Sequence, residues 1–263
     1  MVLSQPPVLR EAVVLLWLGH FLWPFLRITG LCLTAPLYSS PLIPGQVKAL
    51  LAAALAAALA LWLPDLPAFP ASPPAAIYAG LTQIAYGALM GMTMQIVIAA
   101  ISSAGEIAGL AMGLSFAELQ FRQSAGATPV LYDIMIWAGL LGFMAAGGPV
   151  WLFAALAHSF DHGIGVAPLS SWVELTSLGA TLFSAAVALA LPVMAVSLAV
   201  NFTVGLATVF APSLNLLSIG FPLLILAGLW VLLASLPAIG PAAQYLTSVG
   251  MNALAGLVPH GGL

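Results

Sequence analysis

Long apolar runs decide what this chain can fold into. Six segments of at least 17 residues are dominated by aliphatic and aromatic side chains, and a membrane-spanning helix needs roughly 20 such residues. The chain is 63% hydrophobic and 4% charged, whereas soluble domains carry about 25% charged residues. A soluble fold of 263 residues could not hide so much apolar surface. The sequence therefore predicts an all-α membrane protein.

Prolines and glycines divide this single predicted integral-membrane domain, residues 1–263, into about six long, partly broken apolar helices that form kinked helical hairpins. The predicted segments are 12–34, 47–63, 77–113, 130–158, 172–208 and 216–236, with a tail at 242–263. We expect Gly147-Gly148-Pro149 to break the fourth segment, and Pro237 and Pro241 to end the sixth. Broken helices at membrane depth persist only where protein or a water-filled cavity covers them. Heavy packing against other helices, from this chain or a partner, is therefore expected.

The few charges limit the possible functions. Four basic residues and a net charge of −3 give no footprint for nucleic acid. No nucleophile motif or phosphate-binding glycine loop is recognisable, so the sequence predicts neither an enzyme nor a cofactor site. Lys48 and Arg122 favour cytoplasmic first and third loops with both termini outside, although Arg10 opposes that orientation.

The stretch 102–133 differs from the apolar background. It holds four of the chain's eleven charged residues, namely Glu106, Glu118, Arg122 and Asp133. Small residues recur every fourth position at Gly105, Gly109 and Gly113, so that on a helix they share one face on which another backbone can approach closely. Gly87 and Gly91 form a similar pair. After Gly113 the helical pattern gives way to a polar loop that also carries aromatic residues.

Other polar residues have competing interpretations. A buried Glu106 could relay protons, but a structural hydrogen bond or a place near the surface is favoured. Arg27 either extends toward a nearby loop or pairs with a buried acid. His158 and His162 have the spacing of two metal ligands on one helix face. A polar loop is favoured there, so no metal site is predicted.

Three stretches of the chain carry a family resemblance. They are FLWPFLRITGLCLTAPLYSSPLIPGQVKALLA, GMTMQIVIAAISSAGEIAGLAMGLSFA and LPVMAVSLAVNFTVGLATVFAPSLNLLSIGFPL. Together they closely resemble the FliR family of flagellar export-gate proteins, whose counterparts serve injectisomes. The resemblance implies a subunit of a larger helical export-gate assembly, built with FliP-like, FliQ-like and FlhB-like subunits. It further implies the bacterial inner membrane at the flagellar basal body, and unfolded secreted proteins in transit.

The resemblance also implies a role for the central loop. In the family, the loop matching Met112 to Pro129 lies inside the pore and helps to plug it. The plug or gate residues predicted here are Met112, Leu114, Phe116, Leu119 and Phe121. Residues predicted to serve helix packing or assembly are Gly87, Gly91, Gly105, Gly109, Gly113, Glu106, Arg27, Pro212, Asn215, Gly220, Phe221 and Pro222. The alternative is an ordinary cytoplasmic loop whose aromatic rings rest on lipid headgroups.

Rival functions remain for the chain as a whole. The equivalent injectisome subunit is one alternative, although the flagellar version fits better. A small proton-coupled transporter using Glu106 and Asp133 is another, but transporters of that kind usually contain an internal repeat, and no convincing repeat is present. A metalloenzyme using His158 and His162 ranks third.

Overall fold

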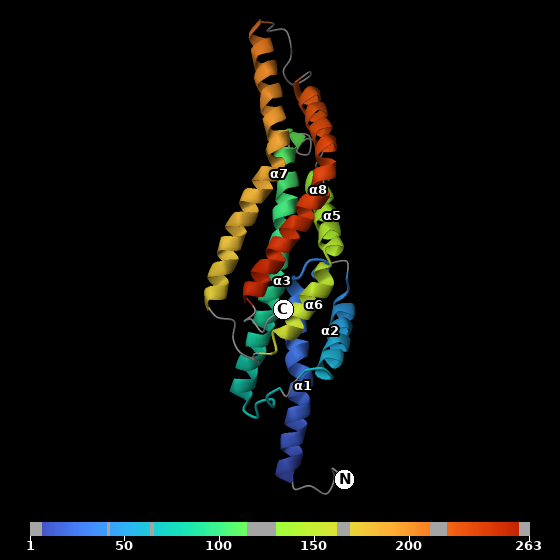
Figure 1. Ribbon diagram of the computed structural model, residues 1–263, viewed down its shortest axis with the longest axis vertical. Helices are drawn as coiled ribbons and strands as arrows, with labels where there is room; N and C mark the ends of the chain where they lie inside the picture. The colour runs from blue at the N-terminus through green and yellow to red at the C-terminus, as the bar shows by residue number, and fades with distance from the viewer. Residues whose placement is uncertain are drawn as a thin grey trace. The chain divides into compact units, whose positions relative to one another are not determined.

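The described part of the chain is helical. The structure is a computed structural model that describes residues 7–40, 43–63, 66–114, 130–161, 169–210 and 220–257, without the side chains at 7–12, 169–172, 174, 175 and 257. These residues form helices joined by turns and, before α3, by an irregular connection (Figure 1). The chain divides into two compact units: the first is Met1–Gln95, Gly147–Ser177 and Val249–Leu263, and the second is Ile96–Ala146 and Leu178–Ser248.

The observed helices agree with the predicted fold class of an all-α membrane protein. They are α1 (Pro7–Thr34), α2 (Gly45–Ala60), α3 (Pro73–Ala111), α5 (Val130–Ala145), α6 (Gly148–His158), α7 (Leu169–Phe210) and α8 (Phe221–Leu257). Within the described residues, α1, α3, α7 and α8 are long and apolar enough to cross a membrane, and α5 with α6 makes a fifth candidate if this bent pair is one span. Helix α2 has 16 residues and is about 24 Å long, shorter than the ~30 Å hydrocarbon core.

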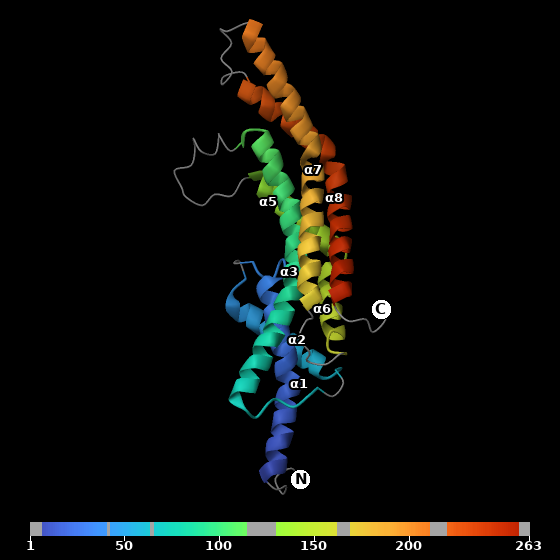
Figure 2. The same cartoon turned by 90° about the vertical axis from the view of Figure 1, so that its left-hand side faces the viewer.

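In the first unit, α1 and α3 run side by side in the same direction (Figure 2). Their backbones touch where glycines remove the Cβ. A Cβ at Gly30 would overlap the carbonyl of Ile84, and one at Gly87 would overlap the carbonyl of Arg27. Further along, a Cβ at Gly91 would overlap the Thr34 hydroxyl. Small residues therefore bring these two helices into backbone contact, as they do in membrane helix pairs generally.

The proline-rich connection before α3 lies against α1. The Trp23 indole N–H donates to the carbonyl of Pro67 at 2.9 Å, and the ring of Phe69 lies 5.1 Å from that of Trp23. The N–H of Phe69 donates to the carbonyl of Leu15 at 2.9 Å. These contacts pair backbone groups of the connection with groups of α1.

The second unit consists of two antiparallel pairs, α3 with α5 and α7 with α8 (Figures 1 and 2). Its apolar cluster contains the buried residues Ala108, Met112, Leu131 and Val193, with Leu114, Val231 and Leu232 packed against them. A Cβ at Gly105 would overlap the carbonyl of Leu131, so α3 and α5 are in backbone contact. The four helix segments therefore share one core.

The predicted end of the sixth segment is wrong. Helix α8 continues through Pro237 and Pro241 to Leu257, and so includes most of the predicted tail. Each proline removes one backbone hydrogen bond and crowds the preceding turn. In lipid, however, an unwound segment would leave several backbone groups without water or partners, so the helix is the less costly conformation.

Among the described glycines, two adopt positive φ angles. Gly147, at 71°, separates α5 from α6 and confirms the break predicted at Gly147-Gly148-Pro149. Gly113, at 74°, lies beyond the end of α3 at Ala111. The prediction that Gly113 continues the helical glycine face is therefore wrong. A left-handed residue ends a helix, and glycine adopts that conformation without strain.

A matched pair of substitutions on α3 tests the α1–α3 contact. We expect Gly87→Ala to lower the thermal unfolding midpoint of the detergent-solubilised protein, because overpacking costs on the order of 1–3 kcal/mol. Gly80→Ala is the control, since its Cβ would lie 3.5 Å from Leu26 Cδ1, an ordinary contact. Alanine also favours the helix, so this variant should be unchanged or slightly more stable. Equal unfolding midpoints for the two variants would contradict the backbone contact between α1 and α3.

Candidate functional site

Arg27 is the centre of a buried polar cluster in the first unit. Its side chain is 1% exposed. Its Nε donates to Gln83 Oε1 at 2.9 Å, and Nη2 donates to the same oxygen. Its Nη1 donates to the carbonyl and hydroxyl oxygens of Ser159, at 3.0 and 2.7 Å. One guanidinium therefore joins α1 to α3 and to the residue that caps α6.

Two aromatic rings complete the surroundings of Arg27. Its Cζ lies 3.9 Å from the ring centroid of Phe160 and 4.6 Å from that of Tyr86. The negative faces of aromatic rings attract a cation, and the carbonyl end of α6, which Ser159 caps, carries a partial negative charge. Neutral groups thus stabilise this buried charge.

Both sequence interpretations of Arg27 are wrong. The side chain does not extend to the surface, and its partners among the described residues are an amide, a hydroxyl, a carbonyl and two rings rather than an acid. Arginine suits this environment because its planar fork presents five donors and stacks on rings. The cluster joins α1 to α3 and to the end of α6.

From the sequence we considered His158 and His162 as metal ligands, but we did not identify Ser159 and Phe160, which lie between them. Ser159 and Phe160 contact Arg27, whereas the exposed His158 pairs with Asp161 at 3.2 Å. His162 lies outside the described residues. Within those residues, no three His, Cys, Asp or Glu side chains are grouped to hold a metal ion. The signal that could have found the cluster is Gln83, a rare amide in an apolar segment.

The glycines of α3 differ in how tightly they are packed. Gly87 and Gly91 lie against α1, and Gly105 lies against the backbone of α5. A Cβ at Gly109 would lie 3.7 Å from Leu131 Cδ1, an ordinary contact. Close approach is therefore concentrated at the first three positions. Their predicted role in assembly with other subunits stays a prediction.

The end of α3 is anchored before the chain enters the central loop. Met112 is fully buried, and a Cβ at Gly228 of α8 would overlap it. A Cβ at Gly113 would lie 3.2 Å from the ring of Phe221. Leu114 packs on the same cluster. The last described turn before residue 115 is thus fixed against α8. Gly220 and Pro222 flank Phe221 in the chain, and their predicted role in assembly stays a prediction.

Several predicted residues lie outside the described residues. These are Phe116, Leu119 and Phe121 of the plug, and Pro212 and Asn215 between α7 and α8. Their roles stay predictions.

Glu106 is exposed on α3, and Asp133 is exposed in the first turn of α5. An exposed carboxylate on a membrane-spanning helix is costly in lipid. The structure therefore favours, for Glu106, contact with water or with a polar group outside this chain.

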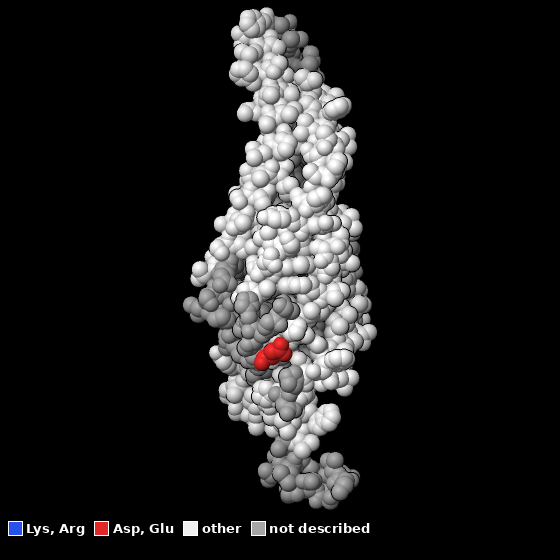
Figure 3. Space-filling view, viewed as in Figure 1, with Lys and Arg blue, Asp and Glu red and all other residues white. Residues whose placement is uncertain are grey.

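The second unit leaves much apolar surface uncovered. Only 22% of the most apolar window of α7 and 11% of that of α8 are buried. Their exposed residues include Leu198, Phe202, Phe210, Leu226 and Trp230. The face shown in Figure 3 is uncharged in its described residues apart from a small acidic patch. Such surface belongs against lipid or against other apolar helices.

Substitutions of Arg27 test whether the cluster joins the helices. We expect Arg27→Ala to destabilise the protein by about 3 kcal/mol or more, because it opens a void and leaves buried acceptors unpaired. Arg27→Lys should restore little, since one ammonium cannot reproduce the fork between Gln83 and Ser159. Thermal unfolding in detergent measures both effects. Full stability of Arg27→Lys would indicate that only the charge matters and would contradict the cluster.

Comparison with known proteins identifies the family. Residues 18–249 match the family described as Bacterial export proteins, family 1. The chain is 38% identical to the flagellar biosynthetic protein FliR of Escherichia coli (strain K12) over 92% of this chain and 94% of that protein. It is 32% identical to FliR of Pectobacterium carotovorum subsp. carotovorum over the same shares, and 27% identical to FliR of Aquifex aeolicus (strain VF5) over 88% of each chain. The chain therefore belongs to family 1 of the bacterial export proteins, together with the flagellar biosynthetic protein FliR.

Proposed function

We propose that this chain is an integral membrane subunit of the flagellar type III protein-export gate. The observation that carries the proposal is the family match over residues 18–249, which extends from α1 into the last part of α8. The relatives are named for flagellar biosynthesis. The uncovered faces of α7 and α8 support a subunit that functions within a larger assembly.

The finer proposal places the chain in the bacterial inner membrane, at the flagellar basal body, beside FliP-like, FliQ-like and FlhB-like subunits. Exposed Glu106 supports a polar contact with such a neighbour, because a carboxylate is costly against lipid. The exposed aromatic residues of α7 and α8 support apolar contacts, since aromatic side chains are enriched at protein interfaces. Together the subunits form the channel for unfolded flagellar proteins.

The central loop is proposed to plug this channel at rest. Its composition is mixed, with Phe116, Leu119 and Phe121 among polar neighbours. Apolar side chains can close a water-filled pore by constriction and dewetting. The buried Met112 and the partly buried Leu114 support the proposal by holding the start of the loop against this chain's own core. In this arrangement they anchor the plug, and Phe116, Leu119 and Phe121 occlude the pore.

Two experiments test the export function. In the native host, deletion of the gene should abolish motility and the release of flagellar proteins, and the intact gene should restore both. An affinity-tagged chain should co-purify with FliP-like and FliQ-like subunits from detergent-solubilised membranes. A chain that purifies as a self-contained unit, in a strain whose deletion leaves secretion intact, would contradict the proposal.

Glu106→Gln separates the gate from the transporter alternative. The substitution removes the charge and keeps the shape and most hydrogen bonds. We expect secretion to continue, because Glu106 is exposed and serves a contact rather than a proton path. Gly109→Ala, a mild change on the same helix, is the control for expression. Loss of secretion with full co-purification would instead support a proton-coupled role.

Deletion of residues 116–121 tests the plug. We expect the complex to assemble, since Met112 and the helix contacts remain, but to leak small ions and metabolites and to slow growth. Membrane conductance of cells expressing the variant measures the leak. A second variant replaces the same six residues with Gly and Ser, which keeps the loop length and removes the apolar side chains. We expect this variant to leak as well. Normal conductance in both variants would show that these residues do not occlude a pore.

A further inference from the structure

One side of α3 in the second unit is left uncovered over about three turns. Ala99, Ser103, Glu106 and Leu110 follow one another at intervals of four, three and four residues, so they lie along one side of the helix. Ala99, Glu106 and Leu110 are exposed, and Ser103 is partly exposed. At 1.5 Å per residue these four residues, the Glu106 row, extend over about 16 Å.

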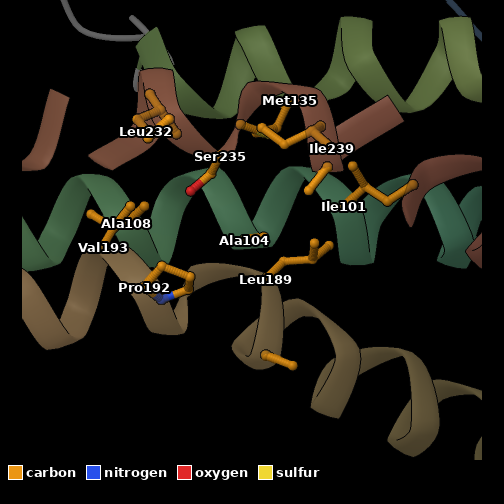
Figure 4. A pocket seen from close by; sticks show the side chains of 13 residues that line it. Ile101, Ala104, Ala108, Met135, Leu189, Pro192, Val193, Leu232, Ser235 and Ile239 are labelled. Atoms are coloured by element: carbon orange, nitrogen blue, oxygen red, sulfur yellow. The ribbon is translucent and has the colours of Figure 1, made fainter. Parts of the chain in front are cut away.

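The other sides of this segment of α3 contact the chain's own helices. Ile101, Ala104 and Ala108 line an apolar cavity together with residues of α7 and α8 (Figure 4). Gly105 contacts the backbone of α5 at Leu131. The Glu106 row is therefore the side of the segment that this chain leaves for another group.

The composition of the Glu106 row fits a protein contact better than lipid or water. A carboxylate is costly against lipid. A wall that faces water has no need of apolar side chains, yet Leu110 is 58% exposed. Ala99 and Ser103 are small residues four positions apart, the spacing that lets the backbone of another helix approach closely. A polar side chain beside such a small, apolar contact is typical of helices that associate in membranes.

The charge of the second unit indicates which side chain complements Glu106. Among the described residues of this unit, Glu106 and Asp133 are charged, and no Lys, Arg or His occurs. The sequence of its two segments, 96–146 and 178–248, adds Glu118 and Arg122, so three acids and one cation give a net charge of −2. A carboxylate that leaves water needs an opposite charge or several hydrogen-bond donors. Charge complementarity therefore favours a cation on the partner.

We propose that the Glu106 row binds a helix of a neighbouring export-gate subunit, and that this helix carries a Lys or Arg opposite Glu106. The inference rests on the proposed function, because that function supplies the neighbour. Ala99 and Ser103 allow the two helices to approach closely, and the cation pairs with the carboxylate where the contact excludes water. A pair of this kind fixes the register of the two helices and disfavours a partner of like charge.

Photo-crosslinking tests which group covers the Glu106 row. The photoreactive residue p-benzoylphenylalanine takes the place of Leu110, which leaves Glu106 unchanged, and the tagged chain is illuminated after purification with its partners. Mass spectrometry should find the cross-link on an apolar helix of a partner subunit, within about one turn of a Lys or Arg. The same residue in place of the exposed Leu198 of α7 is the control and should not label that peptide. A cross-link confined to this chain, the absence of any protein cross-link, or a labelled helix without a cation would overturn the proposal.

Charge reversal tests the pairing itself. We expect Glu106→Lys to lower the amount of the cross-linked subunit that co-purifies by about tenfold or more, because like charges then meet in the contact. Glu106→Gln should lower it much less, since the amide oxygen still accepts a hydrogen bond from the cation. Reversal of the identified Lys or Arg to Glu in the partner should restore co-purification with Glu106→Lys. Full co-purification of Glu106→Lys, or no rescue by the reciprocal change, would overturn the proposal.

Failure of this contact differs from failure of the proposed function. A native chain that co-purifies with FliP-like and FliQ-like subunits, but does not cross-link to a partner from position 110, would refute the contact at the Glu106 row and leave the proposed function intact. A native chain that co-purifies with neither subunit would contradict the proposed function, and this inference with it.

Discussion

Backbone contact between α1 and α3 determines how the first unit can hold a charge in its interior. At Gly30 and Gly87 the helices approach until a methyl group would overlap the opposite carbonyl. At that separation Arg27 of α1 reaches Gln83 and Tyr86, which lie one turn apart on α3. A wider spacing would leave room for water or for other side-chain conformations. The glycines therefore fix the geometry in which a guanidinium is stabilised by neutral groups.

An apolar environment also changes whether a proline ends a helix. In water, a chain that leaves the helix exchanges its hydrogen bonds for bonds to solvent, so Pro237 and Pro241 would be expected to end α8. In lipid this exchange is impossible, and the loss of one bond per proline is smaller than the loss of a whole turn. The break at Gly147 is different, because a left-handed glycine changes the direction of the chain between α5 and α6. The left-handed conformation of Gly147 ends α5, whereas the missing N–H groups of Pro237 and Pro241 do not end α8.

The apolar runs made the fold class and most helices predictable from the sequence, because runs of that length have few alternatives in a membrane. The break at Gly147 was predictable because two glycines and a proline follow one another there, and this sequence favours the end of a helix. The Arg27 cluster was not predictable, because its partners come from positions 56 and 132 residues further along the chain. Periodicity placed Gly105 and Gly109 on one face, but only the neighbouring α5 distinguishes a backbone contact at the first from a side-chain contact at the second. The plug residues and the segment with Pro212 and Asn215 lie outside the described residues and stay predictions.

The charged residues differ in whether this chain itself provides their partners. Arg27 is enclosed and has its hydrogen-bond partners within the first unit, so groups of this chain offset the cost of burying its charge. Glu106 is exposed on a helix long enough to span the membrane, and the lipid interior provides neither a hydrogen-bond donor nor a counter-charge for a carboxylate. The same contrast holds for apolar groups: Met112 is enclosed, whereas Phe202 and Trp230 are exposed. The chain therefore satisfies its interior cation with its own groups and leaves an acid and several aromatic rings exposed.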